Sequence, residues 1–400
     1  MVKVAILGYG TVGSGVFEII KENNDVVNEK SLNDIDIKYV LDLREFPGDP
    51  CENVLVHDYD VILNDPEVEI VIEVMGGLHP AYEFVKAALE AGKSVATSNK
   101  ELVAKYGAEL INIAKSHKRN FLFEAAVGGG IPIIRPINMH ITADRIQQIA
   151  GIMNGTTNYI LTKMEKEGAD FDSTLKQAQD LGYAERNPEA DIEGFDAVRK
   201  IAILTSLAVE KTVNFEEIYT EGISKITSDD FKYAKAMGKT IKLIAESKID
   251  GDKVVAGVAP MLLSEDHPLY SVNGVVNGIL VRGNMVGDLV FIGSGAGKLP
   301  TASAVVSDVV DCIRHLNTST TIIWEDKKQE LQSFQDSVKR FFVRTKASQP
   351  EIKEIFGDVE YVDGGMAGEG GFITGPLSEK EFEIKASDLG KIISRIRIAD

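Results

Sequence analysis

Residues 1–21 have the sequence MVKVAILGYGTVGSGVFEIIK, in which a strand pattern, a glycine motif and a helix pattern follow one another. The apolar, β-branched run at 2–7 predicts a buried strand, and residues 14–21 predict a helix. Between them, Gly8, Gly10 and Gly13 form the pattern G-x-G-x-x-G. In this context the glycines allow a tight turn and a close approach of the backbone to a pyrophosphate, which the helix N-terminus attracts. The segment therefore predicts a Rossmann-type domain that binds a dinucleotide.

The second predicted strand, residues 35–41, ends beside an acidic and a basic residue, Asp42 and Arg44. An acidic residue at this position binds the adenosine ribose hydroxyls of NAD, whereas a nearby arginine accommodates the 2′-phosphate of NADP. The sequence offers both groups, so the expected cofactor is NADP or NAD, and Arg44 favours NADP or the use of both. The alternative for Arg44 is a solvated charge on a loop.

Further strands and helices alternate along the chain: strands are predicted at 70–75 and 94–97, and helices at 80–90 and 101–114. This alternation is typical of an α/β fold with a doubly wound parallel sheet, in which ligands bind at the carboxyl ends of the strands. Gly76 and Lys100 both fall at such ends. A lysine at the start of a helix gains nothing from the helix dipole, so contact with a ligand explains Lys100, and a surface lysine is the alternative.

A strand predicted at 121–126 leads into the glycine-rich segment 127–130. Glycines permit unusual backbone angles there and expose carbonyl oxygens. Together with Glu124, these oxygens suit a monovalent cation. A crossover between two domains is the alternative, and the two interpretations are compatible.

A second domain of α+β type is expected after residue 140. Its predicted elements are a strand at 146–153, a helix from Thr156 to Gly168, a helix at 228–247, and strands at 254–262 and 278–285. The last two strands are expected to pair antiparallel with the first. Hydroxyls and free N–H groups at the start of the first helix can receive a carboxylate.

Residues 194–209 form an almost entirely apolar helix pattern, which is typical of a helix buried in a large protein. Asp196 and Lys200 interrupt it, and their spacing of four places them on one face. Charges in such a helix are costly unless they are paired or functional. Glu185 and Asp191 lie in a preceding loop, so three carboxylates and an amine are expected to converge. The alternative is a partly buried ion pair that ties a loop to a helix.

The C-terminal part of the chain contains two further patterns. Residues 293–298, GSGAGK, resemble a phosphate-binding loop but fail its test, because Ile292 and Leu299 occupy the positions of the first glycine and the final Ser or Thr. A helix predicted at 302–316 is expected to return the chain to the nucleotide domain. From 340 to 398 the predicted order is βαββαβ, a split β-α-β domain with no evident catalytic group of residues.

The composition argues against several classes of function. The net charge of −18 disfavours binding to nucleic acid and to anionic membranes. No run of about eighteen apolar residues occurs, and the chain starts in a strand pattern that leaves no room for a signal peptide. Cys51 and Cys312 give no disulfide framework and suit a reducing cytoplasm. The six histidines lack the spacing of metal ligands.

Residues 1 to about 315 resemble the homoserine dehydrogenase family. The resemblance is carried by five segments in the family's order and spacing: GYGTVG, TSNK, AAVGGGIPIIRP, NGTTNYIL and LGYAERNPEADIEGFDAVRK. It implies an NAD(P)-dependent oxidoreductase of amino-acid biosynthesis that interconverts L-homoserine and L-aspartate 4-semialdehyde on the route to threonine, methionine and isoleucine. We expect a cytoplasmic homodimer or homotetramer.

The resemblance also implies roles for individual residues. Lys200 matches the proton donor, Asp196 its partner acid, and Lys100 a second lysine that reinforces the positive field. The residues expected to bind substrate are Thr156, Tyr183, Glu185 and Asp191. The residues expected to bind the cofactor are Gly8, Gly10, Thr11, Val12, Gly13, Arg44, Gly76, Lys100 and Gly297. The residues expected to bind a monovalent cation, sodium, are Glu124, Val127, Gly129 and Ile131.

Residues 332–400 resemble an ACT domain, the small amino-acid-sensing module of some homoserine dehydrogenases. Its first strand–helix junction is Ser348-Gln349-Pro350-Glu351, where the module usually has D-x-P-G. We expect this domain to bind an amino-acid effector, threonine or another, or to assist oligomerisation. The expected domains are an NAD(P)-binding domain at 1–130 and about 293–320, a substrate-binding and dimerisation domain at 131–292, and the ACT-like domain at 332–400.

The residues leave two alternatives open. One is a sensor that binds a dinucleotide and an amino acid without catalysis, but such a sensor would not need Asp196 and Lys200 on a buried helix. The other is a related amino-acid dehydrogenase with a different substrate. An aldehyde-oxidising enzyme would need a reactive thiolate, and neither cysteine lies in a matching motif.

Overall fold

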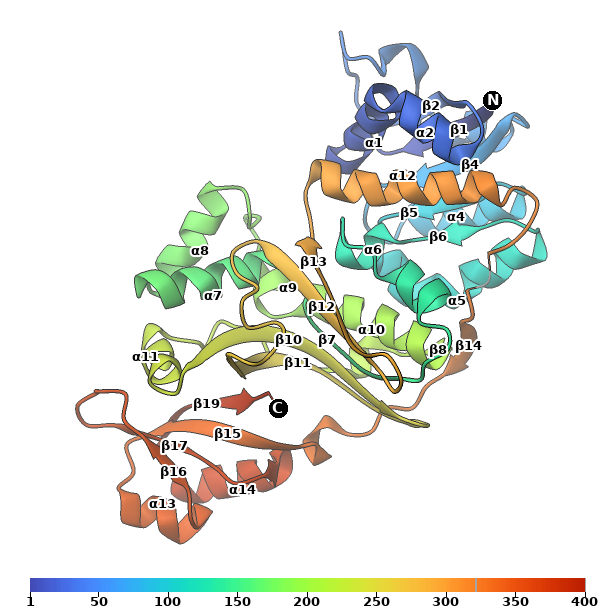
Figure 1. Ribbon diagram of the computed structural model, residues 1–400. Helices are drawn as coiled ribbons and strands as arrows, with labels where there is room; N and C mark the ends of the chain where they lie inside the picture. The colour runs from blue at the N-terminus through green and yellow to red at the C-terminus, as the bar shows by residue number, and fades with distance from the viewer. Residues whose placement is uncertain (321, 400) are drawn as a thin grey trace. The chain divides into compact units, whose positions relative to one another are not determined.

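The chain, for which a computed structural model describes residues 1–320 and 322–399, folds into two units (Figure 1). The first contains Met1–Asp144, Ala202–Asn214 and Gly293–Gln329, and the second contains Arg145–Ile201, Phe215–Ile292 and Glu330–Asp400. Residue 400, the last position of the predicted C-terminal domain, lies outside the described residues. In the part of the chain that is described, every helix is too short or too polar to cross a membrane.

The described residues of the first unit form a six-stranded parallel sheet with the order β3-β2-β1-β4-β5-β6. Its strands are β1 (Val2–Leu7), β2 (Ile35–Leu41), β3 (Leu55–Val56), β4 (Val68–Glu73), β5 (Ser94–Thr97) and β6 (Phe121–Leu122). The order runs outward from β1 in one direction and from β4 in the other. The predicted doubly wound sheet is therefore confirmed, and its switch point lies between β1 and β4.

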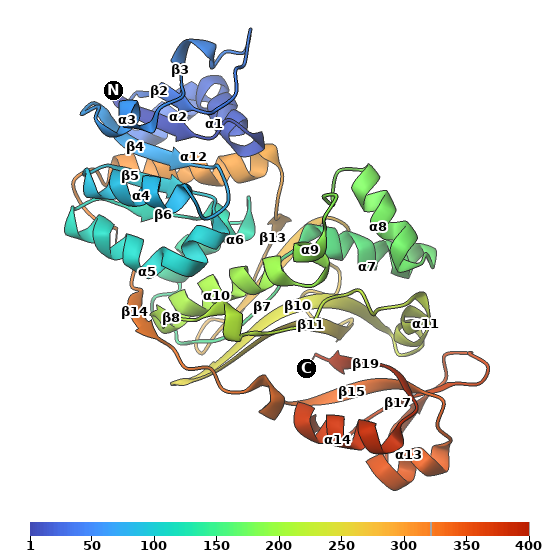
Figure 2. The same cartoon turned by 180° about the vertical axis from the view of Figure 1, so that it is seen from behind.

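Helices cover both faces of this sheet (Figures 1 and 2). On one face lie α1 (Thr11–Glu22), α2 (Asn24–Ser31) and α12 (Lys298–Arg314), and on the other lie α4 (Ala81–Glu90) and α5 (Lys100–Ser116). The smaller elements are α3 (Tyr59–Leu63), α6 (Ala125–Gly128), a π-helical turn (Pro136–His140), and the two paired strands β8 (Lys211–Thr212) and β14 (Glu325–Lys328). α1 and α12 pack closely because Gly15 leaves room: a Cβ there would lie 3.0 Å from the Ala302 Cβ.

The strand predicted at 121–126 is wrong beyond residue 122, because the chain turns into α6. The Glu124 N–H donates to the Asp308 carboxylate at 2.8 Å, and the Ala126 N–H donates to the Phe123 carbonyl at 2.9 Å. An acidic residue that is distant in the sequence therefore helps to end the strand. The local sequence could not predict that contact, because Asp308 is 184 positions away.

The described part of the second unit is organised around an eleven-stranded mixed sheet, with the main path β13-β12-β7-β10-β11-β19-β15-β17-β16. Its strands are β7 (Ile146–Ile152), β9 (Tyr219–Thr220), β10 (Lys239–Asp250), β11 (Lys253–Ser264), β12 (Val276–Gly283), β13 (Gly287–Ser294), β15 (Val338–Thr345), β16 (Glu360–Val362), β17 (Gly370–Ile373), β18 (Leu377–Ser378) and β19 (Ile392–Ile398). The predicted antiparallel pairing of β7 with β12 is confirmed, but β11 pairs with β10 and not with β7.

The helix predicted at 228–247 is wrong in its second half. α11 (Ser228–Ala236) is followed by Gly238 with φ +63°, a conformation typical of residues just after a helix, and β10 starts at Lys239. β10 lies between β7 and β11 and is buried along most of its length. Its buried positions include the polar Thr240, Lys242 and Ser247, so the strand lacks a continuous apolar run, and Ile241, Ile244 and Ala245 have the i, i+3, i+4 spacing of a helix.

The C-terminal part of the second unit has the predicted βαββαβ order. Its helices α13 (Gln349–Phe356) and α14 (Glu379–Leu389) lie together on one face of strands arranged β19-β15-β17-β16 (Figure 2). The rings of Phe341, Phe372 and Phe382 form the core between helices and strands. β19 also pairs in parallel with β11, so this sheet continues into the rest of the unit.

Candidate active site

The glycine motif joins β1 to α1 and has the backbone geometry that its sequence predicts. Gly8 adopts φ +93°, and a Cβ at Gly13 would lie 1.9 Å from the Gly8 carbonyl oxygen. At Gly10, in contrast, an added Cβ would meet no described atom within 4 Å. Gly8 and Gly13 are therefore required by backbone conformation and packing, whereas Gly10 leaves one side of the backbone accessible. A dinucleotide pyrophosphate fits this arrangement.

Three further predicted cofactor residues lie in the same unit. Thr11 and Val12 are the first residues of α1, so their N–H groups are among the four that a helix leaves without intrahelical partners. Gly297 immediately precedes α12 and adopts φ +113°. A glycine is needed at this position because few other residues adopt that angle.

Asp42 and Arg44 form one ion pair at the end of β2. Arg44 Nε and Nη2 each donate to Asp42 at 2.9 Å, and the Tyr9 N–H donates to the same carboxylate at 2.8 Å. The Arg44 guanidinium is the main reason why the pKa of the Asp42 carboxyl lies well below its usual range. The Arg44 side chain is 62% exposed, and its guanidinium lies over the Phe46 ring at 5.1 Å. The acidic and basic groups that the sequence offered as alternatives therefore act on each other.

A buried glutamate fixes the end of β4, beside the predicted cofactor residue Gly76. Glu73 accepts the Thr97 hydroxyl at 2.6 Å and the Met75 N–H at 2.9 Å. Burial raises the pKa of the Glu73 carboxyl, and these hydrogen bonds oppose that effect. Gly76 itself adopts φ +78°, and a Cβ there would meet no described atom within 4 Å. The turn after β4 is thus held from inside the protein and accessible on its outer side.

The same network continues to Lys100, the first residue of α5. Thr97 accepts the Asn99 N–H at 2.9 Å, and Asn99 caps α5 by accepting the Leu102 N–H at 3.1 Å. The Asn99 side chain also donates to the Gly77 carbonyl at 2.6 Å. Lys100 and Gly76 therefore belong to neighbouring strand ends that one hydrogen-bond network joins.

Glu124, predicted to bind a cation, is engaged by the chain itself. Its Oε1 accepts the N–H groups of Ile133 and Ile134 at 2.6 and 2.7 Å, and its Oε2 accepts that of Arg135 at 2.9 Å. The carboxylate therefore holds the glycine-rich turn in place. It does not fit the role of a free anionic ligand, so a cation here depends on other oxygens.

The other predicted cation residues, Val127, Gly129 and Ile131, lie in that turn. Gly129 adopts φ +57° and packs so tightly that a Cβ would lie 2.3 Å from the Gly295 carbonyl oxygen. Among the described residues, no group of three or more His, Cys, Asp or Glu side chains is placed to hold a metal ion. Main-chain carbonyl oxygens, which hard cations accept as ligands, are the groups that this turn can offer.

Asp196 and Lys200 form a buried ion pair on α10 (Phe195–Val209). Their side chains are 6% and 9% exposed, and Lys200 Nζ donates to Asp196 Oδ2 at 2.7 Å. The same amine donates to the Met153 carbonyl at 2.7 Å. The spacing of four residues thus brings the two charges together, as predicted. The two acceptors fix the orientation of the buried amine.

Asn154 connects this ion pair to Asp191. It follows β7 and precedes α7 (Gly155–Glu167), while Asp191 lies in α9 (Glu189–Ile192). Asn154 Nδ2 donates to Asp191 Oδ1 at 2.7 Å and to Asp196 Oδ2 at 3.0 Å. We call Asn154, Asp191, Asp196 and Lys200 the lysine cluster. It contains three of the predicted site residues and one that the sequence reasoning missed.

The remaining predicted substrate residues lie near the start of α7 and after α8 (Phe171–Asp180). The Thr156 hydroxyl donates to the Tyr183 carbonyl at 2.6 Å, and the Tyr183 ring lies 5.0 Å from that of Tyr159. Glu185 is exposed, and its main-chain carbonyl accepts Gln179 Nε2 at 3.1 Å. The described structure therefore does not bring the Glu185 carboxylate into the lysine cluster. Of the three carboxylates expected to converge, those of Asp191 and Asp196 do so.

The two positioning residues that the sequence reasoning missed are Asn154 and Glu73. Asparagine before a helix is a common N-cap, so that part of the role of Asn154 had a local signal. Its bonds to residues 37 and 42 positions away had none. Glu73 ends the apolar strand VEIVIE, and a charge at the buried end of such a strand is the signal that could have identified it.

Comparison with known proteins identifies two family profiles in the chain. The profile described as "Homoserine dehydrogenase, NAD binding domain" matches residues 8–124, and the one described as "Homoserine dehydrogenase" matches residues 132–310. A homoserine dehydrogenase from Synechocystis sp. is 46% identical over 326 residues, which are 80% of this chain and 75% of that protein. One from Bacillus subtilis is 41% identical over 350 residues, which are 86% of this chain and 81% of that protein.

Solved structures give the same result along the full chain. A homoserine dehydrogenase from Thiobacillus denitrificans superposes with a TM-score of 0.90 at 35% identity, covering 100% of this chain and 98% of that one. One from S. aureus gives a TM-score of 0.82 at 32% identity, with 100% and 98% covered. A hyperthermophilic archaeal homoserine dehydrogenase in complex with NADPH gives 0.66 at 29% identity, over 78% of this chain and 97% of that one.

Proposed function

The chain belongs to the homoserine dehydrogenase family, a family of NAD(P)-dependent oxidoreductases, and we propose that it interconverts L-homoserine and L-aspartate 4-semialdehyde. The lysine cluster is the observation that carries this proposal. The reaction needs a proton donor beside the substrate oxygen and an anion for the substrate ammonium. Lys200 and Asp191 offer these two groups, and Asn154 links them. This activity places the enzyme in the biosynthesis of threonine, methionine and isoleucine.

Proton transfer is the chemistry that the chain's own residues perform. When bound, the nicotinamide supplies or accepts a hydride at the aldehyde or alcohol carbon. As negative charge develops on the substrate oxygen, Lys200 donates a proton to it, and in the oxidising direction Lys200 accepts that proton. Asp196 and the Met153 carbonyl orient the amine.

Cysteine chemistry is not part of this mechanism. Burial raises the pKa of the Cys51 thiol to about 11 and that of the Cys312 thiol well above its ordinary value. Thiols with raised pKa values are poor nucleophiles, because the thiolate is the reactive form. Both cysteines are free and buried, which supports a structural role and our proposal of a cytoplasmic enzyme.

The cofactor, in this proposal, binds to the first unit through the glycine motif and the strand ends. Gly8, Gly10, Gly13 and the first N–H groups of α1 hold the pyrophosphate, and Gly76, Lys100 and Gly297 complete the site. We infer that both NAD and NADP are accepted, because Arg44 offsets the Asp42 charge and remains exposed to a 2′-phosphate. The NADPH complex of the archaeal relative supports the use of NADP.

The substrate, in this proposal, is held by its charged amino-acid head. The Asp191 carboxylate receives the ammonium group, and the exposed Glu185 closes over it. Thr156 and Tyr183, which a hydrogen bond already joins, form the side of the pocket at the start of α7. A sodium ion held by main-chain oxygens at Glu124, Val127, Gly129 and Ile131 would fix the glycine-rich turn.

The C-terminal part, residues 332–400, is in this proposal an ACT-like domain that binds an amino-acid effector. Its βαββαβ order and strand arrangement support the assignment. At the first strand–helix junction Ser348 forms a capping box with Glu351 in place of the glycine turn that the module usually has. In the same proposal residues 1–130 and 293–320 bind the cofactor, and residues 131–292 bind substrate and form a homodimer or homotetramer interface.

Homoserine-dependent reduction of NAD and of NADP by the purified protein tests the proposed function. We expect reduction of both cofactors, and a response to threonine or another amino acid would assign the C-terminal domain its effector. Mass measurement in solution gives the oligomeric state. Tight binding of dinucleotide with no turnover of homoserine would instead indicate a sensor or a dehydrogenase with another substrate.

A further inference from the structure

We propose that Asn154 is a positioning residue for the reaction, a role that rests on the proposed function above. Its side-chain amide holds the carboxylates of Asp191 and Asp196 beside each other. In this way it couples the anion that receives the substrate ammonium to the anion that orients Lys200. Asn154 itself need not touch the reacting atoms.

The orientation of the Asn154 amide is fixed by the helix that it caps. Its Oδ1 accepts the Thr157 N–H at 2.9 Å, and its main-chain carbonyl accepts the Thr157 hydroxyl at 3.1 Å. Because the oxygen is committed to α7, the two N–H groups of Nδ2 must point away from that helix. There they meet Asp191 Oδ1 at 2.7 Å and Asp196 Oδ2 at 3.0 Å. The cap and the carboxylate contacts therefore depend on one rotamer, and the residue is 7% exposed.

The two carboxylates need a neutral donor of this shape. They come from separate elements, α9 and α10, and two carboxylates that share a donor repel each other. One amide group provides two donors without adding charge, and hydrogen bonds to ionised acceptors are stronger than neutral ones. Aspartate in this position could cap α7 but would add a third negative charge. Serine could cap α7 but would be too short to reach both carboxylates.

Met153, the residue before Asn154, also contacts the lysine cluster. The Met153 carbonyl accepts Lys200 Nζ at 2.7 Å, so two consecutive residues after β7 contact the amine and both carboxylates. β7 lies inside the sheet between β10 and β12, which makes its end a rigid support. A rigid support matters because small displacements of catalytic groups lower the rate strongly.

The simpler role for Asn154 is that of a helix cap alone. The variants Asn154→Ser and Asn154→Asp separate the two roles, because both retain an oxygen that caps α7. Asp170→Ser is the matched control: Asp170 caps α8 at 2.9 Å through the Ser173 N–H and contacts none of the cluster's residues in the described structure. Unfolding midpoints of the purified variants test whether each remains folded.

Steady-state kinetics with homoserine and cofactor then test the proposal. For Asn154→Ser we expect a kcat lowered by about tenfold to a hundredfold, a raised KM for homoserine and an unchanged KM for the cofactor, with an unfolding midpoint close to that of the wild type. Asn154→Asp should lose more activity because of its extra charge. Wild-type kinetics in Asn154→Ser would overturn the proposal. A variant with lower activity, a raised KM for the cofactor and a lowered unfolding midpoint would also overturn it, because such changes indicate general damage to the fold.

A double-mutant cycle with Asp191→Asn adds a second, independent readout. If Asn154 acts on substrate binding through Asp191, Asn154→Ser should raise the homoserine KM much less in the Asp191→Asn background than in the wild type. Equal effects in both backgrounds would contradict the coupling. An inactive wild-type enzyme would refute the proposed function and, with it, the basis of the positioning role. An active wild type with unchanged kinetics in Asn154→Ser would refute the positioning role alone, so the two failures are distinct.

Discussion

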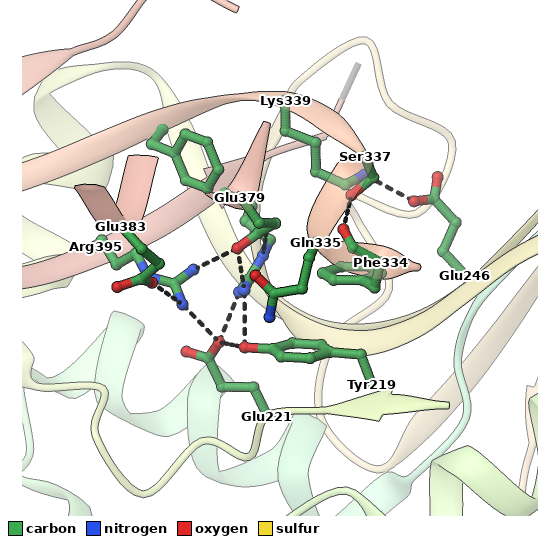
Figure 3. A network of polar contacts seen from close by, with 12 residues as sticks. Tyr219, Glu221, Glu246, Phe334, Gln335, Ser337, Lys339, Glu379, Glu383 and Arg395 are labelled. Carbon is green, nitrogen blue, oxygen red and sulfur yellow. Dashed lines mark hydrogen bonds and ion pairs between the residues drawn. The ribbon is translucent and has the colours of Figure 1, made fainter. Parts of the chain in front are cut away.

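Two buried polar clusters of the second unit contain similar groups and differ in what those groups can do. The first is the lysine cluster. The second, which we call the arginine cluster, contains Arg397, Glu379, Glu221 and Tyr219. Figure 3 shows Glu379, Glu221 and Tyr219 in their network of polar contacts. Arg397 is fully buried and donates to Glu379 at 2.5 and 2.9 Å, to Glu221 at 2.7 Å and to the Tyr219 hydroxyl at 2.9 Å. Its guanidinium also lies over the Tyr219 ring at 5.1 Å.

The identity of the cation separates the two clusters. Burial acts to lower the pKa of the Arg397 guanidinium, but Glu379 and Glu221 outweigh it and raise that pKa further above its ordinary value. A guanidinium in this state cannot release a proton, whereas a lysine amine can do so when its surroundings change. The arginine cluster therefore joins elements, and the lysine cluster can perform chemistry. Burial and pairing alone, which both clusters share, do not identify a catalytic site.

The clusters are also connected through the backbone. The segment that carries Glu221 continues to Ile223, whose N–H donates to the Ile192 carbonyl at 2.8 Å, between Asp191 and the start of α10. A Cβ at Gly222 would lie 2.3 Å from the same carbonyl oxygen. The arginine cluster thus holds the segment that supports the turn before α10.

The largest effect should follow from replacing the amine of the lysine cluster. Lys200→Ala should lower kcat by about 10²- to 10⁴-fold, the usual loss of a general acid. Lys200→Arg sharpens the comparison, because it keeps the positive charge beside Asp196 but removes a releasable proton. We expect it to be nearly as inactive as the alanine variant in a homoserine oxidation assay, with cofactor affinity retained in both. Substantial activity in Lys200→Arg would mean that charge, and not proton transfer, is the function of this residue.

The next largest effect concerns stability and the arginine cluster. Arg397→Met leaves the buried Glu379 and the partly buried Glu221 without their main cation, so it should lower the free energy of unfolding by about 3–5 kcal/mol. Urea unfolding of the purified protein measures this loss. Arg395→Met is the matched control, since its side chain is 20% exposed and binds the same glutamate at 3.1 Å, and it should cost about 1 kcal/mol or less. Equal losses of unfolding free energy in the two variants would show that the buried arginine stabilises the protein no more than the partly exposed one.

These clusters also show how far the sequence could predict the site. The i, i+4 spacing of Asp196 and Lys200 on an apolar helix was a local signal, and the structure forms that pair. The strand, glycine motif and helix at the start of the chain could be predicted because their signals are also local in the sequence. Asn154 and Arg397 could not, because their partners lie 18 to 178 positions away in the chain. β10 was missed as well, because buried polar residues such as Lys242 interrupt its apolar run and leave a spacing that a helix shares.

A smaller effect is the pH dependence of stability at Glu221. Burial acts to raise the pKa of this carboxyl, but Arg397 and Arg395 outweigh it and lower that pKa below the ordinary value of 4.5. The stabilisation is therefore fully present above pH 4.5 and is lost as the pH falls through the lowered value. Glu221→Gln should be less stable than the wild type near pH 7, and the difference should shrink in acid. Unfolding curves of both proteins across this range provide the test. A stability difference that grows in acid would show that the pKa of Glu221 is raised and not lowered.

The smallest effect on stability is expected at a third ion pair, Asp42–Arg44, which extends the comparison to an exposed arginine. The Arg44 side chain is 62% exposed, so Arg44→Ala should change the free energy of unfolding by about 1 kcal/mol or less. Its effect should appear in cofactor choice instead: kcat/KM for NADP should fall by roughly tenfold, because a phosphate loses a charged partner, while kcat/KM for NAD changes little. Kinetics with both cofactors distinguish this role from a solvated loop charge, which would leave both values unchanged. An equal loss with NAD and NADP would show that Arg44 supports the Asp42 loop and does not recognise the 2′-phosphate.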